Sequence, residues 1–192
     1  MEETASGPAV DGQKQDDPEG AVNALLETLG AARIEHPGGT LLKHLQRVRE
    51  LLVGWGVRRD LQLAGLCHAF YGTDGFPTVL IPVASRSELV RHIGVDAEEL
   101  VYFYASCDRK ASYSTLASDD AVFRDRFTGT SFSPSLQQRR DFAILTAANE
   151  LDIVRVSPAY RDDWGGELLQ LLTLLRPLLS DEAWAATEET LG

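Results

Sequence analysis

Hydrophobic residues recur along most of this chain at the spacing of an α-helix. The clearest stripe follows alternating steps of four and three residues and consists of Leu41, Leu45, Val48, Leu52 and Trp55. Such spacing places its members on one face of a helix. Thr40 can cap the start of this helix, and Gly54 and Gly56 end it. The pattern therefore predicts a helix that follows Thr40 and ends at Gly54 to Gly56.

The same periodicity, combined with capping signals, predicts helices through the rest of the chain. Asp60 is expected to cap one of them, and capping-box or acidic starts occur at Ser85, Asp96 and Ser135. The predicted ranges are 21–29, 60–71, 86–93, 97–106, 119–126, 136–156 and 163–175, with a short helix after Ser180. No alternating strand pattern of useful length is present. The fold class is therefore all-α, with about seven to nine helices.

The length and composition indicate one domain preceded by a tail. The chain has 192 residues, of which 44% are hydrophobic, enough for one substantial core. Residues 1–19 are rich in Gly, Pro, Asp, Glu and Gln and show no hydrophobic period. Such segments cannot bury enough apolar surface to fold. We expect a disordered acidic tail over 1–19 and a helical domain over 20–192.

The distribution of charge excludes two classes of partner. The formal net charge is −11, and acidic residues concentrate at both ends of the chain. A protein that binds nucleic acid or an anionic membrane needs a basic face, so neither partner is expected. No apolar run reaches the ~20 residues of a membrane span, and the N-terminus lacks the features of a signal peptide. These patterns favour a cytoplasmic protein. Its oligomeric state is left open.

Three polar residues lie on otherwise apolar helix faces. His44 borders the stripe described above, His68 follows the apolar run 61–66, and Asp152 follows Leu145 and Ala148 at helical spacing. A buried polar group without a partner costs roughly 1–3 kcal/mol. Two imidazoles and a carboxylate could meet this need by binding one metal ion, as in mononuclear iron sites. Alternatively, each could be a structural residue with an ordinary hydrogen-bond or ion-pair partner.

The motifs around these residues resemble the HD-domain metalloprotein superfamily. The run Asp60-Leu61-Gln62-Leu63-Ala64-Gly65-Leu66 precedes His68, and Ala148-Asn149 precedes Leu151-Asp152. The first segment is most similar to the myo-inositol oxygenase-like branch. The resemblance covers about residues 36–156 and implies an HD-like helical bundle with His44, His68 and Asp152 as metal ligands. The implied ion is divalent, with Fe(II) first and Mn(II) or Zn(II) as the other candidates.

One position departs from the superfamily pattern, in which an Asp directly follows the second His. Ala69 occupies this place, so the resemblance is compatible with a single ion or with a degenerate site that binds none. His36 could act as a further ligand or as a general acid or base. Asp74 could replace the missing carboxylate, and Tyr71 could act beside it. For these residues, a surface turn and local turn contacts are the structural alternatives.

These observations leave two functional hypotheses for a small-molecule substrate and a third, an interaction protein that kept the helical scaffold after losing its chemistry. The first is a metal-dependent HD-like enzyme, either a mononuclear non-haem iron oxygenase or a hydrolase. The alternative is a metal-free binding or lyase-like protein that uses its histidines as acid, base or hydrogen-bonding groups. In either case, the basic residues placed to reach an anionic substrate are Arg86, Arg109 and Lys110.

Overall fold

A computed structural model describes residues 17–192 of the chain. The predicted tail falls mostly on residues 1–16, which lie outside the described residues. Its last part is corrected, because Pro18 and Glu19 belong to the first helix, α1 (Pro18–Thr28). The side chain of Asp17 caps this helix by accepting a hydrogen bond from the backbone N–H of Gly20 at 3.1 Å. Regular structure therefore begins a few residues earlier than the hydrophobic pattern predicts.

The described residues form an all-α domain, which confirms the predicted fold class. Between residues 17 and 192 there are nine α-helices: α1, α2 (Leu41–Gly54), α3 (Arg59–Cys67), α4 (Arg86–Ile93), α5 (Val95–Ala105), α6 (Arg109–Ser112), α7 (Leu136–Val156), α8 (Pro158–Leu174) and α9 (Asp181–Leu191). Two antiparallel hairpins, each of two-residue strands, complete the structure: β1 (Glu35–His36) with β2 (Gly39–Thr40), and β3 (Phe123–Arg124) with β4 (Ser131–Phe132).

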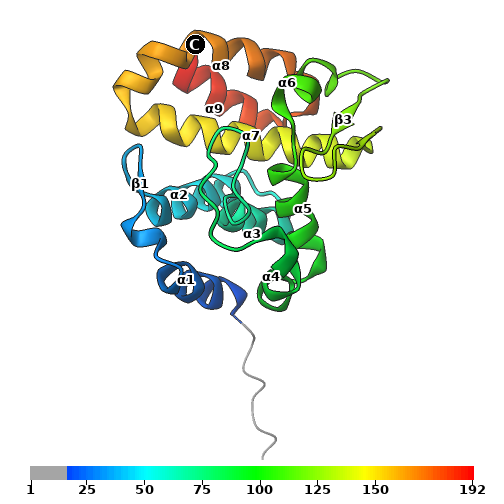
Figure 1. The fold of residues 1–192 in the computed structure, drawn as a ribbon. Helices are drawn as coiled ribbons and strands as arrows, with labels where there is room; N and C mark the ends of the chain where they lie inside the picture. The colour runs from blue at the N-terminus through cyan, green and yellow to red at the C-terminus, as the bar shows by residue number, and fades with distance from the viewer. Residues whose placement is uncertain (1–16) are drawn as a thin grey trace, which may run out of the picture.

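The long helix α7 lies at the centre of the domain. It packs against α2, α3 and α5 on one side and against α8 and α9 on the other (Figure 1). Helix α1 lies beyond this first layer, in contact with α3 and α4. Because α7 has neighbours on both sides, its polar residues Asn149, Glu150 and Asp152 are all buried. The centre of the domain is thus the place where polar groups must find partners within the protein.

Several of the predicted helix starts are confirmed by their caps. Helix α7 begins with a capping box, in which Ser135 and Gln138 bond each other's backbone N–H groups, and Thr40 caps α2. Other predicted caps are wrong. Arg58 is the N-cap of α3 and Asp60 lies in its first turn. Ser85 makes no capping hydrogen bond, and α5 begins at Val95 after Gly94.

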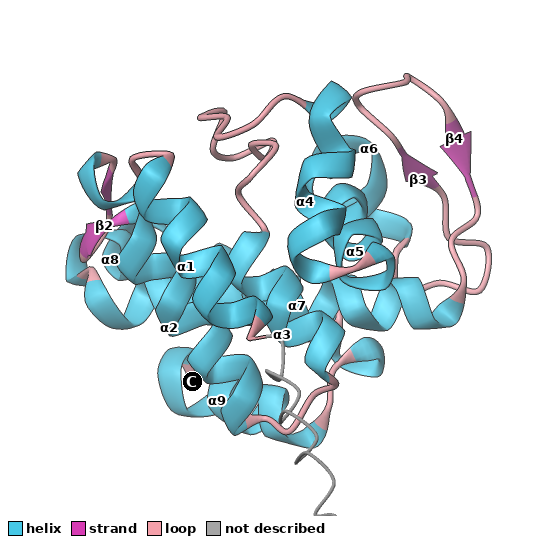
Figure 2. Cartoon of the chain, turned by 90° about the horizontal axis from the view of Figure 1, so that it is seen from below, coloured by secondary structure: helices cyan, strands magenta, loops and turns pink. Residues whose placement is uncertain are grey.

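The segment between α5 and α7 differs most from the prediction. The helix expected over 119–126 is absent from the described structure, where turns and strand β3 occupy that range. The short helix α6 instead begins at Arg109, in a stretch predicted as a loop. Figure 2 shows both hairpins at the outside of the helical body, with β1 and β2 beside α2 and β3 beside α6. Within residues 17–192, none of the helices is long and apolar enough to cross a membrane.

Candidate functional site

Three of the four histidines lie together beside the central helix. The rings of His36 and His44 are stacked, with centroids 4.0 Å apart and planes inclined by 22°. The ring of His68 meets that of His44 nearly at a right angle, with centroids 5.3 Å apart. These residues come from β1, α2 and the end of α3. Three elements from one stretch of the chain, residues 35–68, therefore bring three imidazoles into one cluster.

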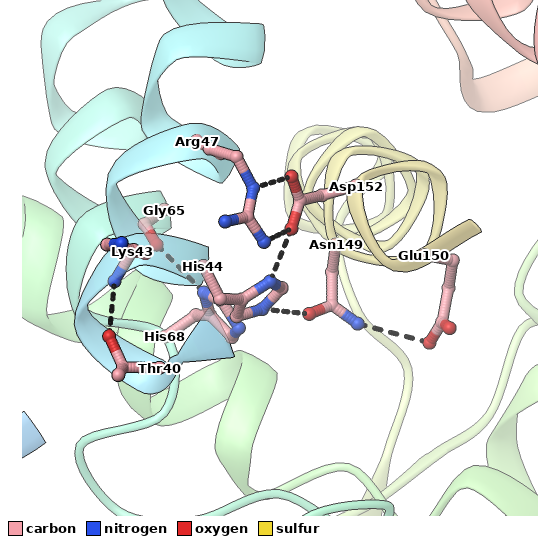
Figure 3. Close-up of polar contacts among 9 residues, drawn as sticks. All are labelled: Thr40, Lys43, His44, Arg47, Gly65, His68, Asn149, Glu150 and Asp152. Atoms are coloured by element: carbon pink, nitrogen blue, oxygen red, sulfur yellow. Dashed lines mark hydrogen bonds and ion pairs between the residues drawn. The ribbon is translucent and has the colours of Figure 1, made fainter. Parts of the chain in front are cut away.

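His44 is held by Asp152 of α7, which also binds Arg47. The Nδ1 atom of His44 lies 2.7 Å from Oδ2 of Asp152. Arg47 donates to both carboxylate oxygens of Asp152, from Nε at 2.6 Å and from Nη2 at 2.9 Å (Figure 3). Burial alone raises the pKa of the Asp152 carboxyl, but the hydrogen bonds from His44 and Arg47 outweigh it and hold the pKa below its ordinary value. Asp152 is therefore an ionised carboxylate whose two oxygens are already bound.

The second nitrogen of His44 continues this network along α7. Its Nε2 atom lies 3.0 Å from Oδ1 of Asn149, and Nδ2 of Asn149 donates to Oε1 of Glu150 at 3.1 Å (Figure 3). Asn149 and Asp152 are one helical turn apart on α7, and His44 and Arg47 are one turn apart on α2. The two helices are thus joined by matching pairs of polar residues. Both nitrogens of His44 serve this junction.

His68 has one nitrogen bound and one without a hydrogen bond. Its Nδ1 atom lies 2.8 Å from the carbonyl oxygen of Gly65. Since a carbonyl only accepts, Nδ1 carries the proton and Nε2 the lone pair. Among residues 17–192, no hydrogen bond of normal geometry reaches Nε2, although the side chain of Asn149 lies near enough to the ring to raise its pKa in part. Burial, together with the neighbouring His44, lowers the pKa of His68 to about 3. The ring is therefore neutral near pH 7 and offers an acceptor.

Within residues 17–192, the His36 ring makes fewer hydrogen bonds than the rings of His44 and His68. It belongs to the β1–β2 hairpin, whose turn residue Gly38 has a φ of +77° and lies against Val156 at the end of α7. The Nδ1 atom of His36 is buried and has no hydrogen-bond partner among residues 17–192. Burial and the adjacent His44 lower the pKa of His36 to about 4. His36 is thus a second neutral imidazole with an unused nitrogen, and its ring is stacked on that of His44.

The histidine cluster forms one side of a cavity of about 200 Å³. For comparison, an engineered cavity of about 150 Å³ in another protein holds a benzene molecule. The residues that line the cavity come from the first hairpin, α2, the end of α3 and the loop after it, α6, α7 and α8: His36, Pro37, Leu41, His44, His68, Ala69, Thr73, Gly75, Phe76, Arg109, Asn149, Glu150, Ile153 and Tyr160. By this comparison the space fits a molecule of roughly eight non-hydrogen atoms.

The cavity is also lined by two charged residues, Glu150 and Arg109. Glu150 accepts a hydrogen bond from the hydroxyl of Tyr160 at 3.1 Å, in addition to the one from Asn149. Nη1 of Arg109 lies 3.5 Å from Oε1 of Glu150. The Glu150 side chain is only 5% exposed and that of Arg109 is 26% exposed. A carboxyl group and a guanidinium therefore line the cavity together with the imidazoles.

Two residues predicted to be catalytic do not line this cavity. The hydroxyl of Tyr71 donates to Oε1 of Glu98 at 2.6 Å, and Arg86 binds the same carboxylate, in a separate cluster between α4 and α5. Asp74 is exposed and accepts a hydrogen bond from the backbone N–H of Arg109 at 3.0 Å. Asp74 thus ties the loop after α3 to the start of α6. Its carboxylate does not take the place of the one missing at Ala69.

The three predicted metal ligands lie together, but their donor atoms do not fit a metal ion in this arrangement. Both oxygens of Asp152 are bound by Arg47 and His44, and both nitrogens of His44 are hydrogen-bonded. Only Nε2 of His68 remains available. A cation at Asp152 would also meet the positive charge of Arg47. Among residues 17–192, no group of three or more His, Cys, Asp or Glu side chains is arranged to hold a metal.

Sequence reasoning missed several residues of the site. Arg47, Glu150 and Tyr160 were not identified, although Arg109 was named as a candidate for an anionic substrate. One signal was available for Arg47, because it lies one helical turn after His44 and so shares its face of α2. Glu150 and Tyr160 depend on how α8 returns over α7. No local spacing encodes that contact.

Comparisons with known proteins add a single match. Residues 25–109 match the model of a domain of unknown function, DUF6817. The matched part includes all three histidines of the cluster and ends at Arg109, and it leaves out α7 and α8. No curated protein and no solved structure gave a significant match.

Proposed function

We propose that this protein binds a small polar molecule in the histidine-lined cavity, and that it does so without a metal ion. The observation that carries the proposal is the pair of neutral rings on the cavity wall, His36 and His68, each with a nitrogen that no described residue bonds. Buried polar atoms in folded proteins nearly always have a partner. A bound molecule would supply the missing hydrogen bonds.

The low pKa values favour binding over catalysis in the ligand-free protein. A general base works best when its pKa lies near the working pH, whereas His36 and His68 have pKa values of about 4 and 3. They are therefore weak bases and good hydrogen-bond partners. Acid–base chemistry is a second candidate if the bound molecule carries an acidic group, because a negative charge beside an imidazole raises its pKa.

The metal-dependent oxygenase or hydrolase remains a prediction from the resemblance to HD domains. For such chemistry, Asp152 would have to release Arg47 and His44, which together make three hydrogen bonds of 2.6–2.9 Å with it. Breaking a buried ion pair of this kind is strongly unfavourable. The site as described supports the metal-free alternative better.

The proposal can be tested with a variant that fills the cavity. Ala69 lines the cavity and is 2% exposed, so Ala69→Leu should occupy part of the space. We would record ¹⁵N spectra of the histidine rings while titrating small polar molecules into chelator-treated protein. The expected result is that some of these molecules shift the His36 and His68 signals in the wild type and that Ala69→Leu abolishes the shifts.

Two controls make this experiment decisive. Ala24→Leu adds the same side chain on the exposed face of α1 and should leave binding unchanged. If Ala69→Leu fails to fold, Ile153→Phe narrows the same cavity from α7. Binding that requires added Fe(II), Mn(II) or Zn(II) and disappears with chelator would contradict the metal-free proposal. Binding that persists in both cavity variants would show that the cavity is not the site.

A further inference from the structure

The guanidinium group of Arg109 has almost no partner although it lies in the cavity wall. Its side chain forms no hydrogen bond with residues 17–192, and its one charged contact is Oε1 of Glu150 at 3.5 Å. A guanidinium carries five N–H donors in a fixed planar fork that matches a carboxylate. Most of the hydrogen-bonding capacity of Arg109 is therefore unused.

Other arginines of similar exposure are bound in the usual way. The side chain of Arg47 is 27% exposed and makes two short hydrogen bonds with Asp152. That of Arg86 is 36% exposed and binds Glu98 through two contacts of 2.7 Å. Exposure alone thus does not explain why the Arg109 side chain lacks hydrogen bonds. The difference is that Glu150, the one carboxylate of residues 17–192 within 4 Å of the Arg109 side-chain nitrogens, is already bound by Asn149 and Tyr160.

The surroundings of Arg109 contain further unused donors. The hydroxyl groups of Tyr104 and Tyr113 are buried and have no hydrogen-bond partner among the described residues. The guanidinium carbon of Arg109 lies 5.8 Å from the centre of the Tyr113 ring. The Tyr104 ring lies 5.5 Å from that of His68. The unpaired phenols and the guanidinium therefore gather at one end of the histidine cluster.

We propose that the molecule bound in this cavity is a small carboxylic acid and that Arg109 binds its carboxylate. This inference rests on the proposed function and specifies the class of ligand. The carboxylate forms a planar pair with the guanidinium, as Asp152 does with Arg47 and Glu98 with Arg86. The rest of the molecule extends toward His36 and His68, where a hydroxyl or carbonyl group would meet the unused ring nitrogens.

A carboxylate fits this end of the cavity better than a phosphate does. Among residues 17–192, Arg109 is the only arginine or lysine that lines the cavity, and the ionisable carboxyl group of Glu150 lies beside it. A phosphate carries more negative charge near pH 7 than a carboxylate and would meet stronger repulsion from Glu150. The volume of about 200 Å³ also limits the ligand to a compact acid.

The experiment compares acids with their uncharged amides. We would titrate acetate, glycolate, pyruvate and benzoate, the four corresponding amides and inorganic phosphate into the full chain, and follow the backbone NMR signals of the residues around the cavity. The acids should bind at least tenfold more tightly than the amides. Arg109→Gln should weaken acid binding about 10- to 100-fold, as expected for the loss of charged hydrogen bonds, and remove the preference for acids.

Matched variants separate the effect of the Arg109 charge from the effect of where its guanidinium group lies. Arg124→Gln removes an arginine of 48% exposure outside the cavity and should not affect binding. Gly75→Ala places a methyl group 2.9 Å from Nη1 of Arg109 and should weaken acid binding with the charge retained. Gly54→Ala is its control, because nothing lies within 4 Å of the added atom.

The possible outcomes distinguish this inference from the function on which it rests. If amides bind as well as acids and Ala69→Leu abolishes both, the cavity binds small molecules but the carboxylate inference is wrong. If phosphate binds more tightly than every acid, the assigned class is also wrong. If no compound of the panel shifts the signals of the cavity residues, both the inference and the proposed function are contradicted.

Discussion

Two groups of polar residues at the histidine cluster use similar side chains in opposite ways. In the first group, called the clamped wall and made of His44, Arg47, Asn149 and Asp152, both ring nitrogens of His44 and both oxygens of Asp152 have close partners. Only His44 and Asn149 of this group line the cavity. On the open wall, which consists of His36, His68 and Arg109, nitrogen atoms of all three side chains lack hydrogen bonds to residues 17–192. Since both walls are built on the same helical scaffold, we attribute stability to the first and ligand binding to the second.

This difference shows why the presence of His and Asp in a core is a poor guide to chemistry. His44 and Asp152 have the residue types of a metal site, but they satisfy each other and leave no atom for a ligand. His68 is in the same cluster and keeps a free acceptor. The number of unmet hydrogen bonds separates the two roles, whereas residue type does not.

The largest effect is expected from breaking the clamped wall. Asp152→Ala removes the partner of His44 and Arg47 at once, and leaves a buried imidazole and a guanidinium without their acceptor. Removing one member of a buried ion pair typically costs 3–5 kcal/mol. The free energy of unfolding, measured with urea, should fall by about that amount.

The control for this variant is a carboxylate on the surface. Glu189 pairs with Arg155 at 3.8 Å and its side chain is 81% exposed. Glu189→Ala should change the free energy of unfolding by less than about 0.5 kcal/mol. A similar small effect for Asp152→Ala would show that the clamped wall does not stabilise the domain.

The sequence predicts the scaffold well where the helices are long. The range 136–156 was predicted and is the observed range of α7, because a capping box and a long apolar pattern both mark it. The segment before α7 could not be predicted in this way. Its backbone is held by contacts such as the N–H of Arg126 donating to the carbonyl of Ser106 at 2.7 Å. Tertiary contacts of this kind produce no periodic pattern of hydrophobic residues in the sequence.

The site was predictable only in part, for a related reason. The apolar faces of three predicted helices indicated that His44, His68 and Asp152 face the interior, and the structure buries all three. Which atoms remain free depends on Arg47 and Asn149, whose partners lie 105 residues away in sequence. Such pairings are set by how α2 and α7 cross. The sequence therefore locates the site more reliably than it identifies its chemistry.

The second-largest expected effect is the pH dependence of the free energy of unfolding that His68, on the open wall, contributes. The pKa of His68 is lowered from 6.5 to about 3 by burial and by the nearby His44 and His36. Between these two values the unfolded chain binds a proton that the folded chain does not, so the free energy of unfolding falls as the pH falls. From pH 6.5 to pH 4 the contribution of His68 is about 3 kcal/mol, at about 1.4 kcal/mol per pH unit.

Replacing His68 isolates this contribution from that of the carboxylates. His68→Asn keeps a donor for the carbonyl of Gly65 but does not titrate. We expect the variant to lose less stability than the wild type between pH 6.5 and pH 4, measured by urea unfolding at each pH. Equal losses in the two proteins would mean that His68 is protonated as readily in the folded state as in the unfolded state.

The smallest expected effect on stability comes from replacing one arginine of each wall, which also compares the two walls most directly. The side chains of Arg47 and Arg109 are 27% and 26% exposed, so the two can be replaced under matched conditions. Arg47→Gln breaks two short hydrogen bonds to Asp152 and should lower the free energy of unfolding by about 2–3 kcal/mol. Arg109→Gln removes only the 3.5 Å contact with Glu150, which keeps the donors Asn149 and Tyr160.

We therefore expect Arg109→Gln to cost less than about 1 kcal/mol in urea unfolding of the ligand-free protein. When ligand binding is measured in place of stability, Arg109→Gln should have the larger effect of the two variants, because Arg109 lines the cavity and Arg47 does not. A stabilising carboxylic acid raises the melting temperature of a protein that binds it. That rise should persist in Arg47→Gln and be lost in Arg109→Gln. If the two variants lose equal stability and equal ligand response, the walls do not have separate roles.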